Sequence, residues 1–377
     1  MKTAIVHEWL VNYAGSERVV ESFTNIWPEA DVFTLVDFLD DEQRKIILNG
    51  KKSTTSFIQN LPFAKNNHRK YLPLFPKAIE SFNLSKYDLI ISSSHSVAKG
   101  FKKHSNQLHI CYCHSPMRYA WDEADRYLKE AKLNKGVKGR IAKSILNYLR
   151  KWDLNSANGV DYFIANSNFI AEKIKRIYNR ISDIIYPPVD VDNFSLSNIK
   201  EDFYLTASRL VPYKRIDLIV ELFADLPDKK LVVIGSGPEK EKIKSMSTPN
   251  VQVLGYQDFQ TLKDYMQKAK AFVFAAEEDF GIIVVEAMAC GTPVIAGNYG
   301  GTAESVVNGK TGILFERQDL KSLKEAILKF ELIKDTFDKN LIRQQALKFE
   351  RKIFEQNIKN YVDDKIKIFF NKNNSAK

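Results

Sequence analysis

The sequence has few cysteines and no long hydrophobic run. Only three of its 377 residues are cysteine, namely Cys111, Cys113 and Cys290. Three are too few for the disulfide framework of a secreted scaffold, so we expect a reducing compartment. No segment approaches the roughly eighteen uninterrupted apolar residues that cross a bilayer, and the apolar stretch after Met1 is too short for a signal peptide. We therefore predict a cytoplasmic protein without a membrane-spanning helix.

Acidic residues are scarce in one part of the N-terminal half. The net charge is +10, of which residues 1–190 carry +8. Between Arg44 and Arg118 there are 13 basic side chains and only two acidic ones, Glu80 and Asp88, interleaved with aromatic residues and leucines. This pattern suits an anionic membrane surface or a nucleic acid. A solvated lysine-rich face is an equally good interpretation.

The remaining composition is ordinary for a globular protein, with 16 glycines, 12 prolines and 27% charged residues. These values exclude collagen, coiled coil and global disorder. At about 100 to 200 residues per domain, the length predicts two domains, or three.

Short apolar, β-branched runs alternate with helical stretches along the chain. The predicted strands of the first half are 3–6, 32–36, 89–91, 108–113, 162–165 and 184–186, and those of the second half are 203–207, 231–234, 251–254, 271–274, 294–296 and 313–315. Alternation at this spacing predicts an α/β fold with two doubly wound, Rossmann-like parallel sheets.

The domain boundary is predicted at 187–200, because Pro187 and Pro188 hold the chain in an extended conformation. We expect an N-terminal domain over 1–190 and a C-terminal domain over 191–350. The chain reads as helical from Leu320 to its end, and we expect residues 351–377 to form a helix that returns to the N-terminal domain. This helix has apolar residues at helical spacing, which are Ile353, Ile358, Tyr361, Val362 and Ile366.

The stretch from Ala275 to Val294 is the most informative part of the sequence. A strand ends near Ala275, and a helix then begins after Gly281 and stops at Gly291. The amides of Phe280, Gly281 and Ile282 would point out of the helix N-terminus, where a phosphate binds well. Glu278 and Glu286 flank this start and suit sugar hydroxyls on either side of a diphosphate. The alternative is that these carboxylates only complement the helix dipole.

Two further loops follow strands of the C-terminal half. Arg209 and Lys214 come after the strand at 203–207, and both side chains suit a diphosphate. Gly235 and Gly237 follow the strand at 231–234 and allow a ligand to approach the backbone. The glycine pair is a weak signal, because the dinucleotide fingerprint needs a third glycine and an acidic partner downstream.

Together with Gly300–Glu304 and Asn308–Phe315, these loops resemble the retaining glycosyltransferases of family 4, which have the GT-B fold of two domains facing a central cleft. The resemblance covers nearly the whole chain. It implies that Glu278 contacts the donor sugar and Glu286 the nucleotide ribose, while Arg209, Lys214 and the amides at 280–282 hold the diphosphate. Asp279 stands where the family usually has glycine, and the usual proline between Gly281 and Glu286 is absent.

The N-terminal half is similar to bacterial surface-polysaccharide mannosyltransferases of that family. The matching segments are 7–10, 14–17, 92–100, 113–122 and 166–167. The resemblance implies that His114 contacts the donor sugar near its reacting carbon and that Gly15 and Ser16 approach the donor. His7, His95 and His114 each follow or closely trail a strand run, so we expect all three to line the cleft, although His7 and His95 are equally well explained as structural residues.

Two rival motifs point to metals. His109, Cys111 and Cys113 alternate along one strand with His114 adjacent, but the second ligand pair of a zinc site is missing. Asp190 and Asp192 match the metal-binding pattern of the other glycosyltransferase fold, GT-A, yet they follow the proline pair. We interpret them as capping the linker and expect neither a metal nor another cofactor.

The sequence therefore predicts retaining transfer of a hexose, first of all mannose from GDP-mannose, to a lipid-linked saccharide in surface polysaccharide synthesis at the inner face of the membrane. Catalysis would rest on His114, Arg209, Lys214 and Glu278. No nucleophile is evident, so the leaving phosphate would accept the acceptor's proton, as proposed for the family. Two alternatives stay open, a nucleotide-sugar epimerase or other GT-B enzyme, and a basic nucleic-acid-binding protein. The base, the acceptor, the linkage and the oligomeric state are left open.

Overall fold

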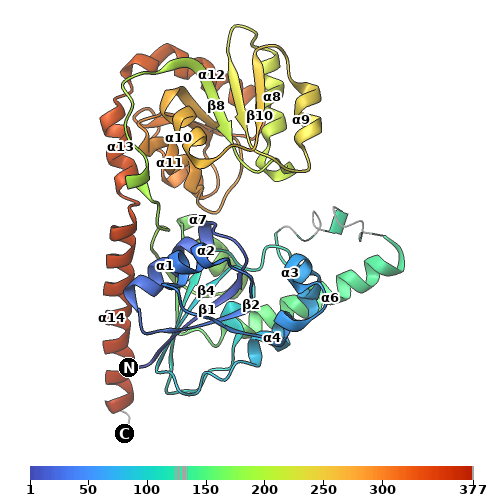
Figure 1. Cartoon of the computed structure of the whole chain (residues 1–377), viewed down its shortest axis with the longest axis vertical. Helices are drawn as coiled ribbons and strands as arrows, with labels where there is room; N and C mark the ends of the chain where they lie inside the picture. Colours follow the sequence, from blue (N-terminus) through green and yellow to red (C-terminus); the bar gives the residue numbers. More distant parts are fainter. Residues whose placement is uncertain (123, 125–127, 130–132, 134, 376–377) are drawn as a thin grey trace. The chain divides into compact units, whose positions relative to one another are not determined.

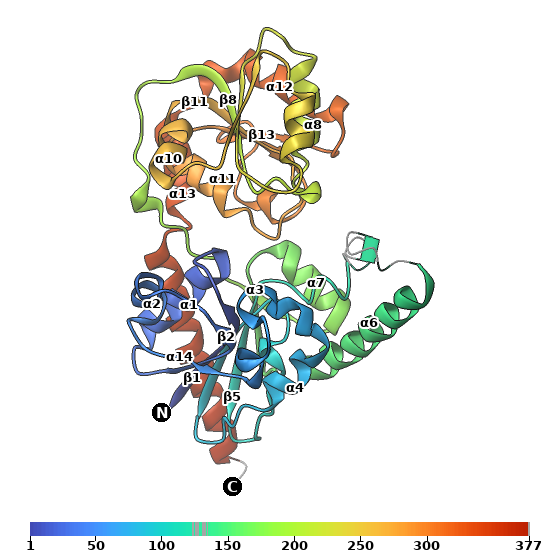
Figure 2. The ribbon, with the colours of Figure 1, turned by 45° about the vertical axis from the view of Figure 1, so that its right-hand side comes forward.

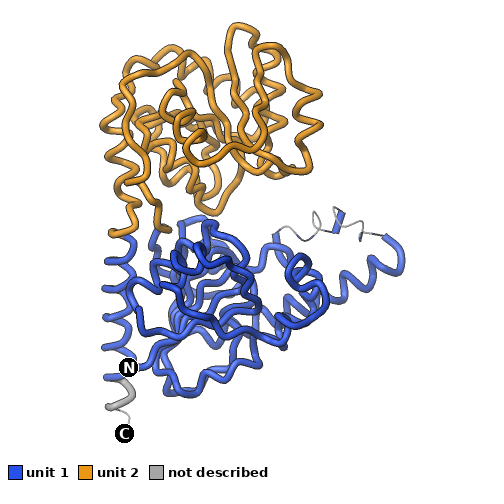
Figure 3. The backbone as a smooth tube through the Cα atoms, viewed as in Figure 1, with its two compact units in different colours: residues 1–186, 354–377 blue, residues 187–353 orange. Residues whose placement is uncertain are grey.

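The structure is a computed structural model that describes residues 1–122, 124, 128–129, 133 and 135–375. The chain divides into two compact units, coloured separately in Figure 3. Unit 1 comprises residues 1–186 and 354–377, and unit 2 comprises residues 187–353.

Unit 1 is built on a parallel sheet of seven strands with helices on both faces (Figure 1). The strand order is β3-β2-β1-β4-β5-β6-β7, and all neighbouring strands run parallel. The strands are β1 (Thr3–Leu10), β2 (Asp31–Asp37), β3 (Thr54–Thr55), β4 (Leu89–Ser94), β5 (Leu108–Cys113), β6 (Tyr162–Ala165) and β7 (Ser182–Ile184). The helices are α1 (Gly15–Ile26), α2 (Asp41–Leu48), α3 (Ala64–Asn67), α4 (Phe75–Glu80), α6 (Gly136–Ala157), α7 (Asn168–Tyr178) and α14 (Arg351–Ser375), with 3-10 turns η1 (Phe57–Asn60), η2 (His68–Leu74) and η3 (Ala98–Gly100).

Alternating residues of the central strands supply two cores, one on each face of this sheet. Val6 and Ile90 belong to the core that also contains Phe75 of α4. Ile5 and Ile91 belong to the other core, which contains Phe23 of α1. Strands buried on both faces need apolar residues at every position, which explains the continuous apolar runs of the sequence.

The C-terminal helix α14 packs on the α1 side of this sheet. Phe354, Ile358 and Val362 are buried in the same core as Phe23, whereas Ile353 is 40% exposed. The ring of Phe354 stacks on that of Phe23 with centroids 6.3 Å apart. The last segment of the chain therefore completes the core of the unit that the first segment begins (Figure 2).

Unit 2 is built on a parallel sheet of six strands in the order β10-β9-β8-β11-β12-β13. The strands are β8 (Glu201–Ala207), β9 (Leu231–Ile234), β10 (Val251–Gly255), β11 (Ala269–Phe274), β12 (Val294–Gly297) and β13 (Gly312–Phe315). The helices are α8 (Ile216–Ala224), α9 (Lys240–Met246), α10 (Phe259–Lys268), α11 (Ile282–Ala289), α12 (Leu320–Ile333) and α13 (Lys339–Leu347), with 3-10 turns η4 (Val191–Asn193), η5 (Pro212–Lys214), η6 (Gly301–Glu304) and η7 (Lys334–Thr336).

Both sheets have the doubly wound topology that the sequence predicts. The direction of winding reverses between β1 and β4 in unit 1 and between β8 and β11 in unit 2. Ligands of such sheets bind at the carboxyl ends of the strands beside this switch point, where the loops on the two sides diverge. The fold thus marks one candidate position in each unit.

Three local predictions need correction. The strand predicted at 184–186 is β7 at Ser182–Ile184, an edge strand whose exposed residues do not form an apolar run. The strand β3 was not predicted, because it has only two residues, both threonine, and these are too few to show a strand pattern in the sequence. The helical region after Leu320 is three helices, with Asp338 as the N-cap of α13. Over the described part of the chain, no helix combines the length and apolarity needed to cross a membrane.

Candidate functional site

The switch point of unit 2 brings together two of the predicted site residues. The loop after β8 carries Lys214, and the loop after β11 carries Glu278. The Lys214 Nζ lies 2.5 Å from Glu278 Oε1, and both side chains are about one-seventh exposed, at 14% and 15%. The loops flanking the switch point therefore present an opposite pair of charges that is close to the surface.

Local backbone conformation sets the position of Lys214. This residue ends the short turn η5, and Arg215 then adopts a left-handed conformation at φ 53° before α8 begins. The Lys214 ammonium also lies over the rings of Tyr213 and Phe274, at 5.3 and 5.4 Å from their centroids. Two aromatic faces and a carboxylate therefore hold the cation in place. Arg209, in the same loop, is exposed.

The helix predicted after Gly281 is α11. Gly281 is its N-cap with φ 85°, in the left-handed region that favours glycine, and a Cβ there would lie 2.6 Å from Thr302 Oγ1. Phe280 is buried against Phe349, with ring centroids 5.4 Å apart. Glu286 lies within α11 and is 8% exposed. The start of α11 and Glu278 are thus adjacent in one rigid loop.

Glycines let the neighbouring loops pack directly on this one. The Gly301 amide donates to Glu278 O at 2.7 Å, and a Cβ on Gly301 would lie 2.0 Å from Asp279 O. On the other side of the switch point, a Cβ on Gly235 would lie 1.8 Å from Ser208 O. The Leu210 amide donates to Ser236 O at 2.9 Å. Gly235, Gly237 and the Gly300–Gly301 pair therefore fix the loops that carry the charged residues.

The switch point of unit 1 contains a buried carboxylate that the sequence analysis did not single out. Glu8, on β1, is fully buried. Its Oε1 accepts hydrogen bonds from the amides of His95 at 3.0 Å, Ser96 at 2.8 Å and Ala98 at 3.0 Å. Burial alone would raise the pKa of Glu8, but His95, His7 and these amides together hold it below its usual value. The feature of the sequence that could have identified Glu8 is an acidic residue inside a largely apolar strand.

His7 lies beside this carboxylate, between two acidic groups. It is fully buried, which favours the alternative that His7 is a structural residue. Its Nε2 lies 3.7 Å from Glu17 Oε1 and its Nδ1 lies 3.8 Å from Glu8 Oε2. Burial opposes a charge on His7, yet the nearby carboxylates of Glu17 and Glu8 outweigh it and raise the pKa. Glu17 Oε2 also accepts from the Ala14 amide at 3.2 Å at the start of α1, which begins at Gly15.

His95 and His114 lie closer to the surface than His7. The side chain of His95 is 23% exposed, and its Nδ1 lies 3.2 Å from Glu8 Oε2. His114 is also partly exposed, and its Nε2 lies 2.8 Å from Ser93 Oγ. Burial lowers the pKa of both histidines and lowers that of His114 well below its ordinary value. Ser16, in the first turn of α1, donates from its hydroxyl to Glu17 Oε2 at 3.0 Å.

The rival metal motifs have other partners. Ser92 Oγ lies 2.8 Å from His109 Nε2, and burial lowers the pKa of this histidine to about 3. Cys111 and Cys113 are buried thiols in a hydrophobic core. The side chain of Asp190 does not cap the linker as predicted, because it accepts from Arg351 Nε at 2.7 Å. In the described ranges, no three His, Cys, Asp or Glu side chains are grouped as a metal site would need.

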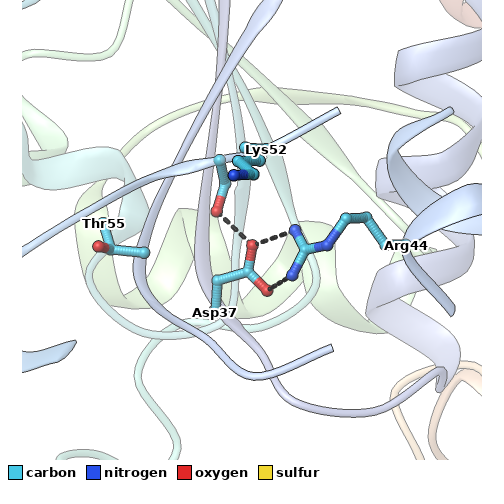
Figure 4. A pocket seen from close by; sticks show the side chains of 5 residues that line it. Asp37, Arg44, Lys52 and Thr55 are labelled. Carbon is cyan, nitrogen blue, oxygen red and sulfur yellow. Dashed lines mark hydrogen bonds and ion pairs between the residues drawn. The ribbon is translucent and has the colours of Figure 1, made fainter. Parts of the chain in front are cut away.

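A pocket at the β2–β3 edge of unit 1 is separate from all of these residues. It is lined by Asp37, Arg44, Lys52, Ser53 and Thr55 (Figure 4). Arg44 binds both oxygens of Asp37, at 2.6 and 2.9 Å, and Ser53 Oγ donates to the same carboxylate at 2.6 Å. The carboxylate is thereby saturated, so this pocket is a structural feature of the sheet edge.

Part of the basic excess between Arg44 and Arg118 is neutralised locally. Four of its cations pair with carboxylates, as Arg44–Asp37, Lys86–Asp31, Lys99–Asp153 and Lys103–Asp161. Three of the exposed lysines, Lys65, Lys70 and Lys77, lie on α3, η2 and α4, which are neighbours. Phe63, which precedes α3, is 82% exposed.

Both halves of the chain match glycosyltransferase families. Residues 13–193 match Glycosyltransferase Family 4, and residues 191–347 match the Glycosyl transferases group 1 family. The HepE protein of Anabaena, solved in complex with UDP, superposes with a TM-score of 0.72 over 97% of this chain and 100% of its own, at 18% identity. The chain is a GT-B, glycosyltransferase family 4-like protein.

Curated relatives of this family 4-like protein align over shorter stretches. An uncharacterized glycosyltransferase of Methanocaldococcus jannaschii is 29% identical over 51% of this chain and 55% of its own. The GDP-mannose-dependent monoacylated alpha-(1-6)-phosphatidylinositol monomannoside mannosyltransferase of Corynebacterium glutamicum is 34% identical over 34% of this chain and 37% of its own. The chain thus spans about half or less of the curated relatives it matches.

Proposed function

We propose that this protein is a retaining hexosyltransferase that uses a nucleotide sugar, and that the switch point of unit 2 binds the donor. The observation that carries this proposal is the Lys214–Glu278 pair at 2.5 Å, beside the start of α11. A cation, a carboxylate and a helix N-terminus in one place suit the diphosphate and the hydroxyls of a nucleotide sugar.

The charges of this site can be assigned to the parts of the donor. The diphosphate takes Lys214 and Arg209 as partners, together with the amides of Gly281 and Ile282. Glu278 exchanges its ion pair with Lys214 for hydroxyls of the sugar, and Glu286 accepts from the ribose. As the glycosidic bond breaks, negative charge develops on the leaving diphosphate, and these fixed cations and amides stabilise it. His114, in unit 1, is assigned a contact with the sugar.

The donor is proposed to be GDP-mannose. The similarity to the mannosyltransferase of C. glutamicum, whose name states its dependence on GDP-mannose, supports this choice. The Anabaena structure was solved with UDP, so uridine donors are the alternative to be tested. GDP-mannose and uridine donors differ in the nucleotide base, and none of the residues assigned above contacts the base. A panel of nucleotide sugars will therefore decide the donor.

The acceptor is proposed to be a saccharide carried by a lipid, which the protein meets on an anionic membrane surface. The surface formed by Phe63, Lys65, Lys70 and Lys77 supports this, because it combines exposed cations with an aromatic side chain. We refer to these four residues as the lysine surface. Its membrane contact would be reversible.

A second exposed apolar face, on α6, supports the same proposal. Val137, Ile141 and Tyr148 are 64%, 56% and 49% exposed, and their helical spacing places them on one side of the helix. The basic residues Arg140 and Lys151 flank this stripe at the same spacing. Apolar residues bordered by cations on an outward helix face are typical of helices that lie at a membrane interface.

The test is to incubate the protein with GDP-mannose, other nucleotide sugars and a lipid-linked saccharide extract, and to follow products by NMR. The proposal predicts release of the nucleoside diphosphate and an α-linked product from an α-linked donor. An isomerised nucleotide sugar without diphosphate release would instead identify an epimerase. Activity should persist in chelator, because the charge stabilisation is assigned to side chains and amides; loss restored by manganese would contradict that assignment.

A further inference from the structure

Hydrogen bonds join three loops at the carboxyl end of the unit 2 sheet. The loop after β8 carries Lys214 and Arg215. The loop after β11 begins with Ala275 and carries Glu278. The loop after β13 carries Gln318 and starts two strands away from β11 in the sheet. Contacts between these loops therefore determine how the residues of the proposed donor site are placed relative to one another.

Arg215 has a backbone conformation that is unfavourable for an arginine. Its φ is 53°, in the left-handed region where a β-carbon is disfavoured. The residue lies between the turn η5 and the helix α8, so its conformation sets the direction in which the chain leaves Lys214. Its Nε donates to Asp217 Oδ1 and its Nη1 donates to Gln318 Oε1, both at 3.2 Å. Such a conformation persists where the surroundings fix the residue, and these two bonds do so.

Gln318 continues this connection to the loop that carries Glu278. Its Oε1 accepts from Arg215, and its Nε2 donates to Ala275 O at 2.7 Å. Tyr299 OH donates to the same carbonyl at 3.1 Å. The side chains of Arg215 and Gln318 are both partly buried. One amide group thus uses its acceptor on the loop after β8 and its donor on the loop after β11, and it bridges the two.

Two connections therefore cross between the loops of Lys214 and Glu278. The first is the ion pair between these residues, at 2.5 Å. Under the proposed function it is given up when the donor binds, because Lys214 then faces the diphosphate and Glu278 faces the sugar. The second connection runs from Arg215 through Gln318 to Ala275 and uses none of the residues assigned to the donor. It can remain intact when the first is broken.

We propose that Arg215 and Gln318 are positioning residues that hold the loops of Lys214 and Glu278 at a fixed separation while the donor is bound. Stabilisation of a leaving diphosphate requires charges that are already in place, and a cation on a loosely held loop loses part of that effect. Neither residue is assigned a contact with the donor. The inference rests on the proposed function, since the ligand is the nucleotide sugar assigned to this site.

The first test measures the connection by NMR on the full-length chain without any ligand. Ala275 and Ala276 are the one pair of consecutive alanines in the sequence. Labelling alanine with ¹³C at the carbonyl and ¹⁵N at the amide therefore gives a single carbonyl–nitrogen correlation, whose position depends on the hydrogen bonds that Ala275 O accepts. Arg215→Gly suits the left-handed backbone and removes the guanidinium, so it should shift this signal, as should Gln318→Ala. An unchanged signal in Arg215→Gly would overturn the proposal.

Asp217→Asn is the matched control for this test. Asp217 contacts Arg215 Nε and lies 3.6 Å from Lys242 Nζ, and its side chain makes no bond to the loop after β11 in the described part of the chain. The alanine signal should stay at its wild-type position in this variant. A shift as large as that of Arg215→Gly would mean that Arg215 acts through the start of α8, which contradicts the proposed connection.

The second test is a double-mutant cycle on kcat with the preferred nucleotide sugar. Arg215→Gly and Gln318→Ala should each lower kcat about tenfold, the usual effect of one lost hydrogen bond to a charged group. The double variant should lose no more than either single variant, because both changes break the same connection. Losses that multiply, or a much larger loss in Arg215→Gly than in Gln318→Ala, would mean that Arg215 acts on the donor directly, against the proposal.

Arg215→Lys separates positioning from a purely structural role. Lysine keeps a donor for Gln318 but also keeps the disfavoured β-carbon, whereas glycine removes both. Positioning predicts that Arg215→Lys retains more turnover than Arg215→Gly, while relief of backbone strain alone predicts the reverse order, which would contradict the proposal. If the wild type turns over no nucleotide sugar, the proposed function fails, and the alanine signal still decides whether the loops are connected. If the wild type is active and all these variants match it, the positioning role alone is overturned.

Discussion

Lys214, Glu278 and Glu8 show at the residue scale what sequence reasoning can find. The types and order of the first two residues predict a donor site, and the structure adds that they form an ion pair. That pairing could not be predicted from spacing, because it depends on β8 and β11 being neighbours. Glu8 was missed because its role lies in its buried contacts, although a carboxylate within an apolar strand is a usable signal.

Replacement of Lys214 by alanine should lower turnover by about two orders of magnitude, the usual cost of losing one preorganised charge partner. The variant also leaves Glu278 without its cation. The measurement is kcat with the preferred nucleotide sugar at saturating acceptor. Lys244→Ala, an exposed lysine of the same unit, is the control and should behave as the wild type. Turnover of Lys214→Ala within a few-fold of wild type would remove this residue from the site.

Glu286→Gln should act on binding more than on turnover. A carboxylate that accepts from the ribose contributes a charge-assisted bond, so its loss should weaken both the nucleotide sugar and the nucleoside diphosphate by about tenfold or more. Calorimetric titration of both ligands measures this. Glu277→Gln changes an exposed carboxylate one residue before Glu278 and serves as the control. If both affinities are retained in Glu286→Gln, the ribose binds elsewhere.

At the scale of elements, strand prediction succeeded where both faces of a strand are buried. The run at 108–113 coincides with β5, and the run at 231–234 coincides with β9. It failed at the sheet edges β3 and β7, because edge strands carry polar residues and need few apolar ones. The contact that connects α6 to η3 could not be predicted from the sequence either, because it is a buried ion pair.

Lys99, in η3, and Asp153, in α6, form this ion pair, and both side chains are almost fully buried. Asp153 also accepts from Trp121 Nε1 and from Tyr178 OH of α7, each at 2.8 Å. Burial opposes the charge on Lys99, but Asp153 outweighs it and raises the pKa of the lysine. Lys99→Met should therefore lower the free energy of unfolding by about 3 to 5 kcal/mol, because it leaves a buried carboxylate without a cation.

Chemical denaturation followed by the tryptophan fluorescence of unit 1 would measure this loss. The double variant Lys99→Met/Asp153→Asn is the control, since the neutral amide still accepts from Trp121 and Tyr178. It should recover a large part of the stability. Equal destabilisation of the single and double variants would mean that packing, not charge, is what Lys99 contributes.

At the scale of the whole molecule, the alternation of strands and helices predicted the class of fold, whereas the charge count located the basic surface too broadly. Two doubly wound sheets follow from the alternation of strands and helices, and the structure confirms them. The basic stretch could not be resolved from sequence into paired and exposed cations, because the pairing carboxylates Asp31, Asp153 and Asp161 lie outside it. Only the structure separates the lysine surface from these buried or paired residues.

The lysine surface should bind anionic liposomes at low salt. Each cation near such a surface contributes about 1 kcal/mol, so Lys65, Lys70 and Lys77 changed together to Glu should weaken binding by roughly a hundredfold or more. Flotation with and without salt measures this, since raising the ionic strength from about 0.1 to 1 M shortens screening from about 10 to 3 Å. Lys321, Lys324 and Lys329, exposed on unit 2, changed to Glu are the matched control. Equal loss in both variants would reflect net charge alone.

Stabilisation of the protein by nucleotide sugars tests the central claim most directly. A ligand at about a hundred times its Kd adds roughly 2.7 kcal/mol to the free energy of unfolding, which a thermal shift resolves. We predict that one nucleotide sugar, first of all GDP-mannose, raises the Tm of the wild type. The same compound should give little or no shift in Lys214→Ala and a full shift in Lys244→Ala. If no nucleotide sugar or nucleoside diphosphate raises the Tm, or if Lys214→Ala responds as fully as the wild type, the assignment of the donor site to the switch point of unit 2 is contradicted.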